Sequence, residues 1–264
     1  MITKNYIAKG EGANRFEKVP VRIYEKPSEA VKAVAREIAD LIRTNADKSE
    51  KCVLGLATGS SPIKLYEELV RMHREEGLSF KNVVSFNLDE YLPMPKESEQ
   101  SYHYFMHHHL FDHIDIDPKN IHIPDGTLKA EEIENFCKEY ERQIEAAGGI
   151  DIQVLGIGRT GHIGFNEPGS PLTSKTRMVY LDDLTIKDAA GDFGGMENVP
   201  SRAITMGVGT IMKARKVILL AWGEKKLLSS KLRSKVVFRM LSLPLFCKYI
   251  RTYSSSSTKV QPKN

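Results

Sequence analysis

Short apolar runs alternate with segments of helical periodicity along most of the chain. The predicted strands cover residues 21–24, 52–57, 83–88, 151–157 and 216–221, and the predicted helices follow Ser28 and Pro62 and cover 101–113, 131–146 and 207–213. Strands that alternate with helices favour βαβ units, and continuous apolar strands are typical of a sheet covered on both faces. We therefore predict an α/β fold with a mostly parallel sheet.

The basic residues are concentrated in the last 40 residues. The formal net charge is +4, yet residues 225–264 contain ten Lys or Arg and no Asp or Glu, which leaves a body with 28 basic and 34 acidic side chains. No basic stripe remains in that body, so nucleic-acid binding is not expected. Residues 1–18 are polar, and no apolar run approaches the roughly 18 residues of a membrane span. We expect a cytoplasmic protein that does not bind a membrane.

Cysteine and histidine do not predict a metal site. The three cysteines lack metal-ligand spacing, and Cys52 and Cys137 are expected to be buried thiols. Five histidines fall in the predicted helix, at positions 103, 107, 108, 109 and 113. Pairs four residues apart could chelate an ion, but no Asp, Glu or Cys elsewhere is spaced to complete a site. We interpret these histidines as an exposed or partly packed helix face.

The sequence Gly-Arg-Thr-Gly-His-Ile-Gly-Phe-Asn-Glu at residues 158–167 follows a predicted strand. Ligands of open α/β sheets bind outside the carboxyl ends of strands. At such a position His162, oriented by Glu167, could move protons near neutral pH. Gly161 would allow a tight turn, and Asn166 could hold the loop or bind a hydroxyl group. The alternative is a glycine-rich turn with an incidental histidine.

A second polar turn, Thr58-Gly59-Ser60-Ser61, joins a predicted strand to the helix that starts at Pro62. Free backbone N–H groups and the positive end of a helix dipole attract phosphate, and Ser61 can cap the helix. No Gly-Lys-Ser/Thr follows, which disfavours nucleoside triphosphates. An ordinary capped helix start explains this turn equally well.

Two adjacent carboxylates, Asp89 and Glu90, follow the predicted strand 83–88. Successive side chains of a strand point to opposite faces, so only one of the two is expected to face a pocket. A partly desolvated carboxylate there would have a raised pKa and could act as a base toward a carbon acid. Right-handed crossovers place strand ends at one edge of a parallel sheet, so the three polar turns could form one pocket.

Taken together, several segments resemble the glucosamine-6-phosphate deaminase (isomerase) family. The matching residues are 54–62, 85–91, 101–102, 111–114, 155–169, 176–177, 199–200 and 203–210, in family order within residues 19–226. The resemblance implies a modified Rossmann-like α/β/α sandwich that converts glucosamine 6-phosphate to fructose 6-phosphate and ammonia. It also implies that no metal or organic cofactor is needed. We expect a homo-oligomer, although the sequence does not reveal the oligomeric state.

The resemblance also assigns roles to individual residues. In the family reaction the sugar ring opens, a proton moves from C2 to C1, and ammonia is released. At the matching positions Asp89 would be the base at C2, and His162, aided by Glu167, would open the ring. The residues implied to bind substrate are Thr58, Gly59, Ser60, Ser61, Glu90, Gly161, Asn166 and Lys226, with the turn at 59–61 and Lys226 on the phosphate.

The chain departs from the family pattern in four places. Thr160 stands where many members have Asp, which removes a charge that would favour the protonated form of His162. We expect a shifted pH optimum, with ring opening slowed more than proton transfer. Residues 185–193 lack an arginine that commonly reaches the phosphate, and Val179 replaces a basic residue of allosteric members. The fourth departure is the C-terminal part of the chain.

Residues 227–264 match nothing in the family, and their composition is typical of a partly disordered tail. We therefore divide the chain into an N-terminal extension (1–18), a sugar-phosphate domain (19–226) and an atypical basic tail (227–264). Two other functions stay open. A 6-phosphogluconolactonase-like hydrolase shares the fold and a Gly-His turn, whereas residues 87–91 and 165–167 favour the deaminase. Thr160, the missing arginine and the atypical tail also suggest a non-catalytic sugar-phosphate sensor.

Overall fold

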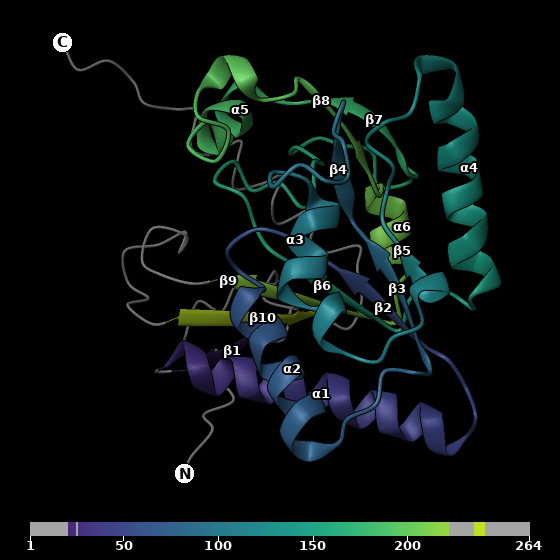
Figure 1. The fold of residues 1–264 in the computed structure, drawn as a ribbon. Helices are drawn as coiled ribbons and strands as arrows, with labels where there is room; N and C mark the ends of the chain where they lie inside the picture. The colour runs from purple at the N-terminus through teal and green to yellow at the C-terminus, as the bar shows by residue number, and fades with distance from the viewer. Residues whose placement is uncertain (1–20, 25, 222–234, 241–264) are drawn as a thin grey trace, which may run out of the picture.

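A seven-stranded sheet forms the centre of the molecule in this computed structural model, which describes residues 21–24, 26–221 and 235–240 (Figure 1). The strand order is β1-β10-β9-β6-β2-β3-β5. The strands are β1 (Val21–Tyr24), β2 (Cys52–Leu56), β3 (Val83–Asn87), β5 (Ile121–His122), β6 (Ile152–Leu155), β9 (Lys216–Ala221) and β10 (Lys235–Met240). The five strands from β9 to β5 are parallel, and only β10 runs antiparallel to its neighbours. The predicted, mostly parallel sheet is confirmed.

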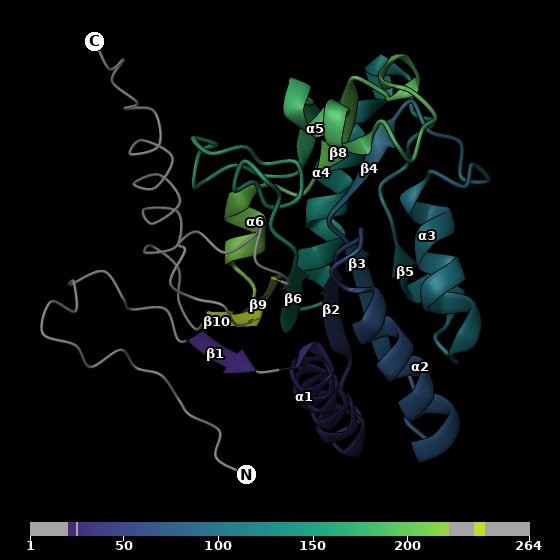
Figure 2. The ribbon, with the colours of Figure 1, turned by 90° about the vertical axis from the view of Figure 1, so that its left-hand side faces the viewer.

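Helices cover both faces of this sheet (Figure 2). One face carries α1 (Pro27–Asp47), α2 (Ile63–Glu76) and α3 (Tyr102–His109), and the other carries α4 (Ala130–Ala146) and α6 (Val208–Met212). The long helices are amphipathic. In α1, Ala30, Val34 and Ile38 are spaced four residues apart and are buried against the sheet. The predicted α/β/α sandwich is confirmed.

A second, three-stranded antiparallel sheet follows the order β4-β8-β7 and lies beyond the ends of the central strands (Figure 1). Its strands are β4 (Asp89–Leu92), β7 (Arg177–Tyr180) and β8 (Arg202–Thr205), and α5 (Asp183–Ala189) packs beside them. The sequence analysis did not anticipate this sheet. Each of its strands has four residues, which is too short for a readable period.

Two predicted helix boundaries differ from the structure. The helix expected at 101–113 leaves α-helical geometry after His109, because Leu110 has φ −141° and ψ −63°, and continues as the 3-10 turn η1 (Phe111–His113). The cap expected from Ser61 on α2 is wrong. The N-cap is Pro62, whose carbonyl accepts hydrogen bonds from the N–H groups of Leu65 (2.9 Å) and Tyr66 (3.0 Å), and no side chain caps the helix there. The remaining short turns are η2 (Pro118–Asn120) and η3 (Met196–Asn198).

Three further sequence predictions concern the cysteines, the basic tail and membrane spans. Cys52 and Cys137 are buried free thiols, as predicted, and burial raises the pKa of Cys52 to about 12. Within the basic tail, residues 235–240 form β10 between β1 and β9. Lys226 and the rest of the predicted partly disordered tail, residues 227–234 and 241–264, lie outside the described residues. No helix in the described part of the chain is long and apolar enough to cross a bilayer.

Candidate active site

The three polar turns follow β2, β3 and β6, which are neighbours in the central sheet. β2 pairs in parallel with β3 on one side and with β6 on the other, so the turns leave the sheet at one edge. A Cβ atom on Gly156, just after β6, would lie 3.7 Å from the Cβ and Oγ atoms of Ser61. The predicted common edge is therefore confirmed. The strand order also reverses at β2, and ligands of open α/β sheets bind at such points.

Asp89 begins β4, one residue after the end of β3, and its side chain is buried. The turn at Gly164 (φ +57°) passes so close that a Cβ atom there would lie 3.1 Å from Asp89 Oδ2. No side chain or backbone group among the described residues donates a hydrogen bond to this carboxyl group. Burial and, to a smaller extent, the neighbouring charge of Glu90 raise the pKa of Asp89 to about 8. Asp89 can thus accept a proton near neutral pH.

Glu90 faces the start of α3. Its Oε1 atom accepts hydrogen bonds from the backbone N–H groups of Tyr91 (2.9 Å) and Tyr102 (3.0 Å), and its Oε2 atom accepts one from His103 (3.0 Å). Burial raises the pKa of Glu90 to about 7 even though these three bonds lower it. A carboxylate in this place satisfies free N–H groups and complements the helix dipole. The geometry therefore favours Asp89 over Glu90 as the carboxylate that accepts a proton from a substrate.

His162, Glu167 and Thr160 form a compact cluster on the loop after β6. His162 Nδ1 lies 3.1 Å from Glu167 Oε1 and 2.9 Å from Thr160 Oγ1. The Thr160 hydroxyl donates to Glu167 Oε2 at 2.7 Å, and the hydroxyl of Thr185 on α5 donates to Glu167 Oε1 at 3.2 Å. Burial raises the pKa of Glu167, but the hydrogen bonds from His162 and Thr160 outweigh it, so the pKa is lowered overall. Glu167 is therefore an anion that can orient the imidazole.

The glycines of this loop make room for the imidazole. A Cβ atom on Gly158 would overlap the ring of His162, so the ring lies directly against the Gly158 backbone. The Gly158 N–H donates to the His162 carbonyl at 2.9 Å, and the Gly161 N–H donates to the Gly158 carbonyl at 3.0 Å. Gly161 has φ +91°, which a residue with a side chain rarely adopts. The loop thus turns tightly around the histidine, as predicted.

Asn166 holds the loop against the second sheet. Its Nδ2 group donates to the carbonyls of Ile163 (3.0 Å) and Met206 (2.8 Å), and its Oδ1 atom accepts from Arg177 at 2.9 Å. The side chain is 3% exposed. Because all three contacts are with the protein, the geometry favours the loop-holding role over the binding of a substrate hydroxyl.

The turn 58–61 lies at the start of α2. Gly59 and Ser60 are exposed, Thr58 is half-buried and Ser61 is buried. Gly59 has φ +84°, so the backbone needs glycine at this position. The ring of Tyr102 on α3 packs against the ring of Tyr91 on β4, with centroids 5.1 Å apart. Sequence reasoning missed Tyr102 as a site residue, although it falls in a family-like segment.

Two other features lie outside this cluster. A cavity of about 580 Å³ lies between α4 and the second sheet, lined by residues of α4, by Lys175 to Met178 and by Arg202. Its lining does not include the three polar turns, so the catalytic candidates are elsewhere.

Within the described residues, no group of three or more His, Cys, Asp or Glu side chains could hold a metal ion. The histidines of α3 pack on each other, with the rings of His103 and His107 stacked at 4.5 Å.

Comparison with known proteins places this geometry in a family. The profile of the family described as glucosamine-6-phosphate isomerases/6-phosphogluconolactonase matches residues 25–233. The chain belongs to this family. A glucosamine-6-phosphate deaminase of Thermoanaerobacter pseudethanolicus is 44% identical over 216 residues, which cover 80% of this chain and 85% of that protein.

Two further relatives extend this result. A protein of Bacteroides thetaiotaomicron named as glucosamine-6-phosphate deaminase-like is 50% identical over 212 residues, or 80% of this chain, but the match spans only 32% of that longer relative. The solved structure of a monomeric glucosamine-6-phosphate deaminase superposes with a TM-score of 0.72 at 40% identity, covering 77% of this chain and 82% of that one. The fold predicted from the family resemblance is therefore shared with a solved deaminase.

Proposed function

We propose that this chain converts glucosamine 6-phosphate to fructose 6-phosphate and ammonia. The observation that carries the proposal is the buried Asp89 carboxyl group, whose raised pKa suits a base, at the sheet edge that also holds the His162–Glu167 pair. A proton on a carbon flanked by oxygen and nitrogen is removed by a positioned carboxylate, and ring opening needs an acid–base group. The relatives named as deaminases support the same reaction.

His162 opens the sugar ring in this proposal. Its Nε2 atom takes the proton of the anomeric hydroxyl and returns a proton to the ring oxygen, while the C1–O5 bond breaks and C1 becomes a carbonyl. The carboxylate of Glu167, 3.1 Å from Nδ1, stabilises the imidazolium that exists between these two transfers. Such a pair contributes typically about 10²- to 10⁴-fold to a rate.

Asp89 then carries the proton transfer between carbons. It removes the proton from C2 while the C1 carbonyl oxygen takes up a proton, which gives an enediol-type intermediate. It then delivers its proton to C1 while the nitrogen gives up a proton, which leaves an imine at C2. Water adds to this imine, and ammonia leaves as the ketone of fructose 6-phosphate forms. A carboxyl group with a pKa of about 8 both accepts and returns a proton in this range of pH.

The remaining predicted residues would hold the substrate. The phosphate would bind the exposed backbone of the turn Thr58-Gly59-Ser60-Ser61 at the start of α2, together with Lys226. Gly161 would shape the loop beneath the sugar. The polar atoms of Glu90 and Asn166 are hydrogen-bonded to protein groups. These two residues would therefore hold the start of α3 and the loop in place instead of contacting the substrate.

The test is to incubate the purified protein with glucosamine 6-phosphate and to measure ammonia and fructose 6-phosphate together. Equal release of both supports the proposal, and Asp89→Asn is the matched control that should release neither. Hydrolysis of 6-phosphogluconolactone without ammonia release would replace the proposal with the lactonase. Binding of the amino sugar phosphate by the wild-type protein without turnover would replace it with the sensor.

Two broader expectations stay predictions. The sequence analysis expects a homo-oligomer, whereas a solved relative is described as monomeric. Sedimentation velocity on the purified chain, with and without glucosamine 6-phosphate, would give its oligomeric state. Fluorescent tagging in the source cells would test the expected cytoplasmic location.

A further inference from the structure

Thr160 contacts both members of the acid–base pair. Its Oγ1 atom lies 2.9 Å from His162 Nδ1 and 2.7 Å from Glu167 Oε2, while the other carboxylate oxygen, Oε1, lies 3.1 Å from the same Nδ1. The three side chains thus close a hydrogen-bonded triangle on one loop. The sequence analysis treated Thr160 only as the loss of an acidic residue.

Counting protons in this triangle assigns the tautomer of His162. The Thr160 hydroxyl has one hydrogen, and it is donated to Glu167 Oε2, so the oxygen offers only lone pairs to the imidazole. Glu167 Oε1 is a second acceptor facing the same ring nitrogen. Two acceptors around Nδ1 require that this nitrogen carries the hydrogen. In the neutral ring Nε2 is then left with its lone pair.

We propose that Thr160 is a positioning residue that, with Glu167, holds neutral His162 as the Nδ1–H tautomer and leaves Nε2 free to accept a proton. This inference rests on the proposed function for its catalytic consequence, since ring opening starts with proton transfer to Nε2. A hydroxyl group fixes the ring without a second negative charge beside Nδ1.

The loop around Thr160 is tied to α5 on its other side. Arg159 forms an ion pair with Asp188 at 2.9 Å, and Thr185 donates to Glu167 at 3.2 Å. Among the described residues, Glu167 on the same loop is the charged group in hydrogen-bond contact with the imidazole.

The first test reads the tautomer directly and needs no turnover. Nitrogen-15 NMR of histidine-labelled protein distinguishes Nδ1–H from Nε2–H rings, and the signal of His162 is the one missing from His162→Gln. We expect an Nδ1–H ring in the wild type, in Thr160→Ser and in Thr160→Val, where Glu167 Oε1 still accepts from Nδ1, and a mixture of tautomers when Thr160→Val is combined with Glu167→Ala. A wild-type ring with the hydrogen on Nε2, or an unchanged tautomer in the double variant, would overturn the proposal.

The second test separates positioning from folding. Thr160→Val keeps the shape of the side chain but loses the hydroxyl, and we expect kcat to fall roughly 10- to 100-fold with KM changed by less than about threefold. Thr160→Ser should recover most of this loss. Thr173→Val makes the same chemical change at an exposed position and should keep the wild-type kcat. Equal kcat values for Thr160→Val and the wild type, at similar melting temperatures, would contradict the role of the hydroxyl.

The third test uses the residue common in the family. Thr160→Asp places a second carboxylate beside Nδ1, and both neighbours of this nitrogen are then hydrogen-bond acceptors, so the tautomer should stay Nδ1–H. The same nitrogen-15 spectra identify the tautomer of this variant. A ring with the hydrogen on Nε2 would contradict the proposed contact. If the wild type shows the expected tautomer but no turnover of glucosamine 6-phosphate, the proposed function fails while the assignment of Thr160 stands.

Discussion

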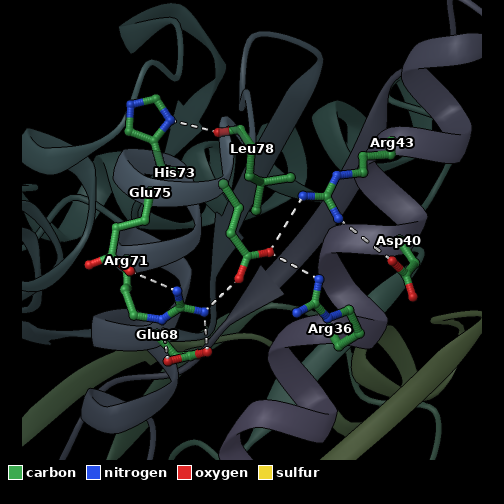
Figure 3. A network of polar contacts seen from close by, with 9 residues as sticks. Arg36, Asp40, Arg43, Glu68, Arg71, His73, Glu75 and Leu78 are labelled. Carbon is green, nitrogen blue, oxygen red and sulfur yellow. Dashed lines mark hydrogen bonds and ion pairs between the residues drawn. The ribbon is translucent and has the colours of Figure 1, made fainter.

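Carboxylates occur in two contrasting settings in this protein, one between α1 and α2 and one at the end of β3. Between the helices, the guanidinium of Arg71 binds Glu68 (2.8 Å), Glu75 (2.9 Å) and Glu76 (2.7 Å), and Arg36 binds Glu76 at 3.0 Å (Figure 3). The hydrogen bonds from Arg71 lower the pKa values of Glu68 and Glu76. These groups stay charged at any pH near neutrality.

At the end of β3 the same chemical groups behave in the opposite way. Asp89 and Glu90 are buried, no cation pairs with them among the described residues, and burial raises their pKa values to about 8 and about 7. A carboxylate with cationic partners contributes a fixed charge, whereas a buried carboxylate without them can exchange a proton. The difference predicts which carboxylates perform chemistry and which only support the fold.

The largest expected effect is on turnover. Asp89→Asn removes the proton acceptor but keeps the shape of the side chain, so we expect kcat to fall by about 10²- to 10⁴-fold with binding of glucosamine 6-phosphate retained. Steady-state kinetics and calorimetric binding measure the two quantities. Turnover within tenfold of the wild type, or a greater loss in Glu90→Gln, would show that the assignment of the two carboxylates is wrong.

The second effect concerns stability against pH. The pKa of Asp89 is raised from 3.8 to about 8 in the fold, so the folded state binds this proton more tightly than the unfolded state. The resulting stability is fully present below about pH 4 and is lost as the pH rises toward 8. Asn does not titrate, so Asp89→Asn should not lose this stability as the pH rises. The melting temperature of Asp89→Asn should exceed that of the wild type by roughly 5 °C at pH 9 and by little at pH 5. A difference that does not depend on pH would show that folding does not raise the pKa of Asp89.

The third effect distinguishes Glu90 from its neighbour. Glu90→Gln keeps one oxygen acceptor but turns an NH₂ group toward the start of α3, so one of three backbone N–H groups loses its partner. We expect a loss of about 1–3 kcal/mol in the free energy of unfolding, measured by urea denaturation. A stability equal to that of the wild type would show that these N–H groups do not depend on the carboxylate.

The smallest effect is expected in the arginine network of Figure 3. Arg71→Met removes a partly exposed guanidinium group that contacts Glu68, Glu75 and Glu76, and ion pairs near the surface contribute little. The melting temperature should change by less than about 2 °C, and kcat should be unchanged. Higher salt should shrink the difference further. A loss comparable to that of Glu90→Gln would mean that the network is as important to the fold as the buried site.

The long helices and the apolar strands of the central sheet could be predicted from sequence, including the four-residue β1, whereas the strands of the second sheet could not. The 21-residue helix α1 repeats its buried positions over several turns, and β2 is apolar throughout, so each carries its own periodic signal. β4 instead places two carboxylates inside a four-residue strand. It becomes a strand because Asp89 pairs with Thr205, more than one hundred positions along the chain. The sequence of residues 89–92 does not indicate that this segment pairs with residues 202–205.

The candidate site shows the same division. The residue types of the three turns and their place after β2, β3 and β6 could be read from the sequence, together with the family reaction that they imply. The separate roles of Asp89 and Glu90 could not, because they depend on the start of α3, twelve residues further along the chain. The cap predicted for Ser61 failed for a related reason, since Pro62 already supplies the first helical carbonyl.

The amino-acid sequence alone therefore determined the apolar strands, the long helices, the glycine-rich turns and the identities of the acid–base residues. Only the tertiary structure decided which carboxyl group is buried without a partner and that Thr160 completes the His162–Glu167 contact. The physical reason is that a pKa and a tautomer depend on burial and on the hydrogen-bonding groups within about 3 Å. Those neighbours come together only when the sheets and the loop have packed.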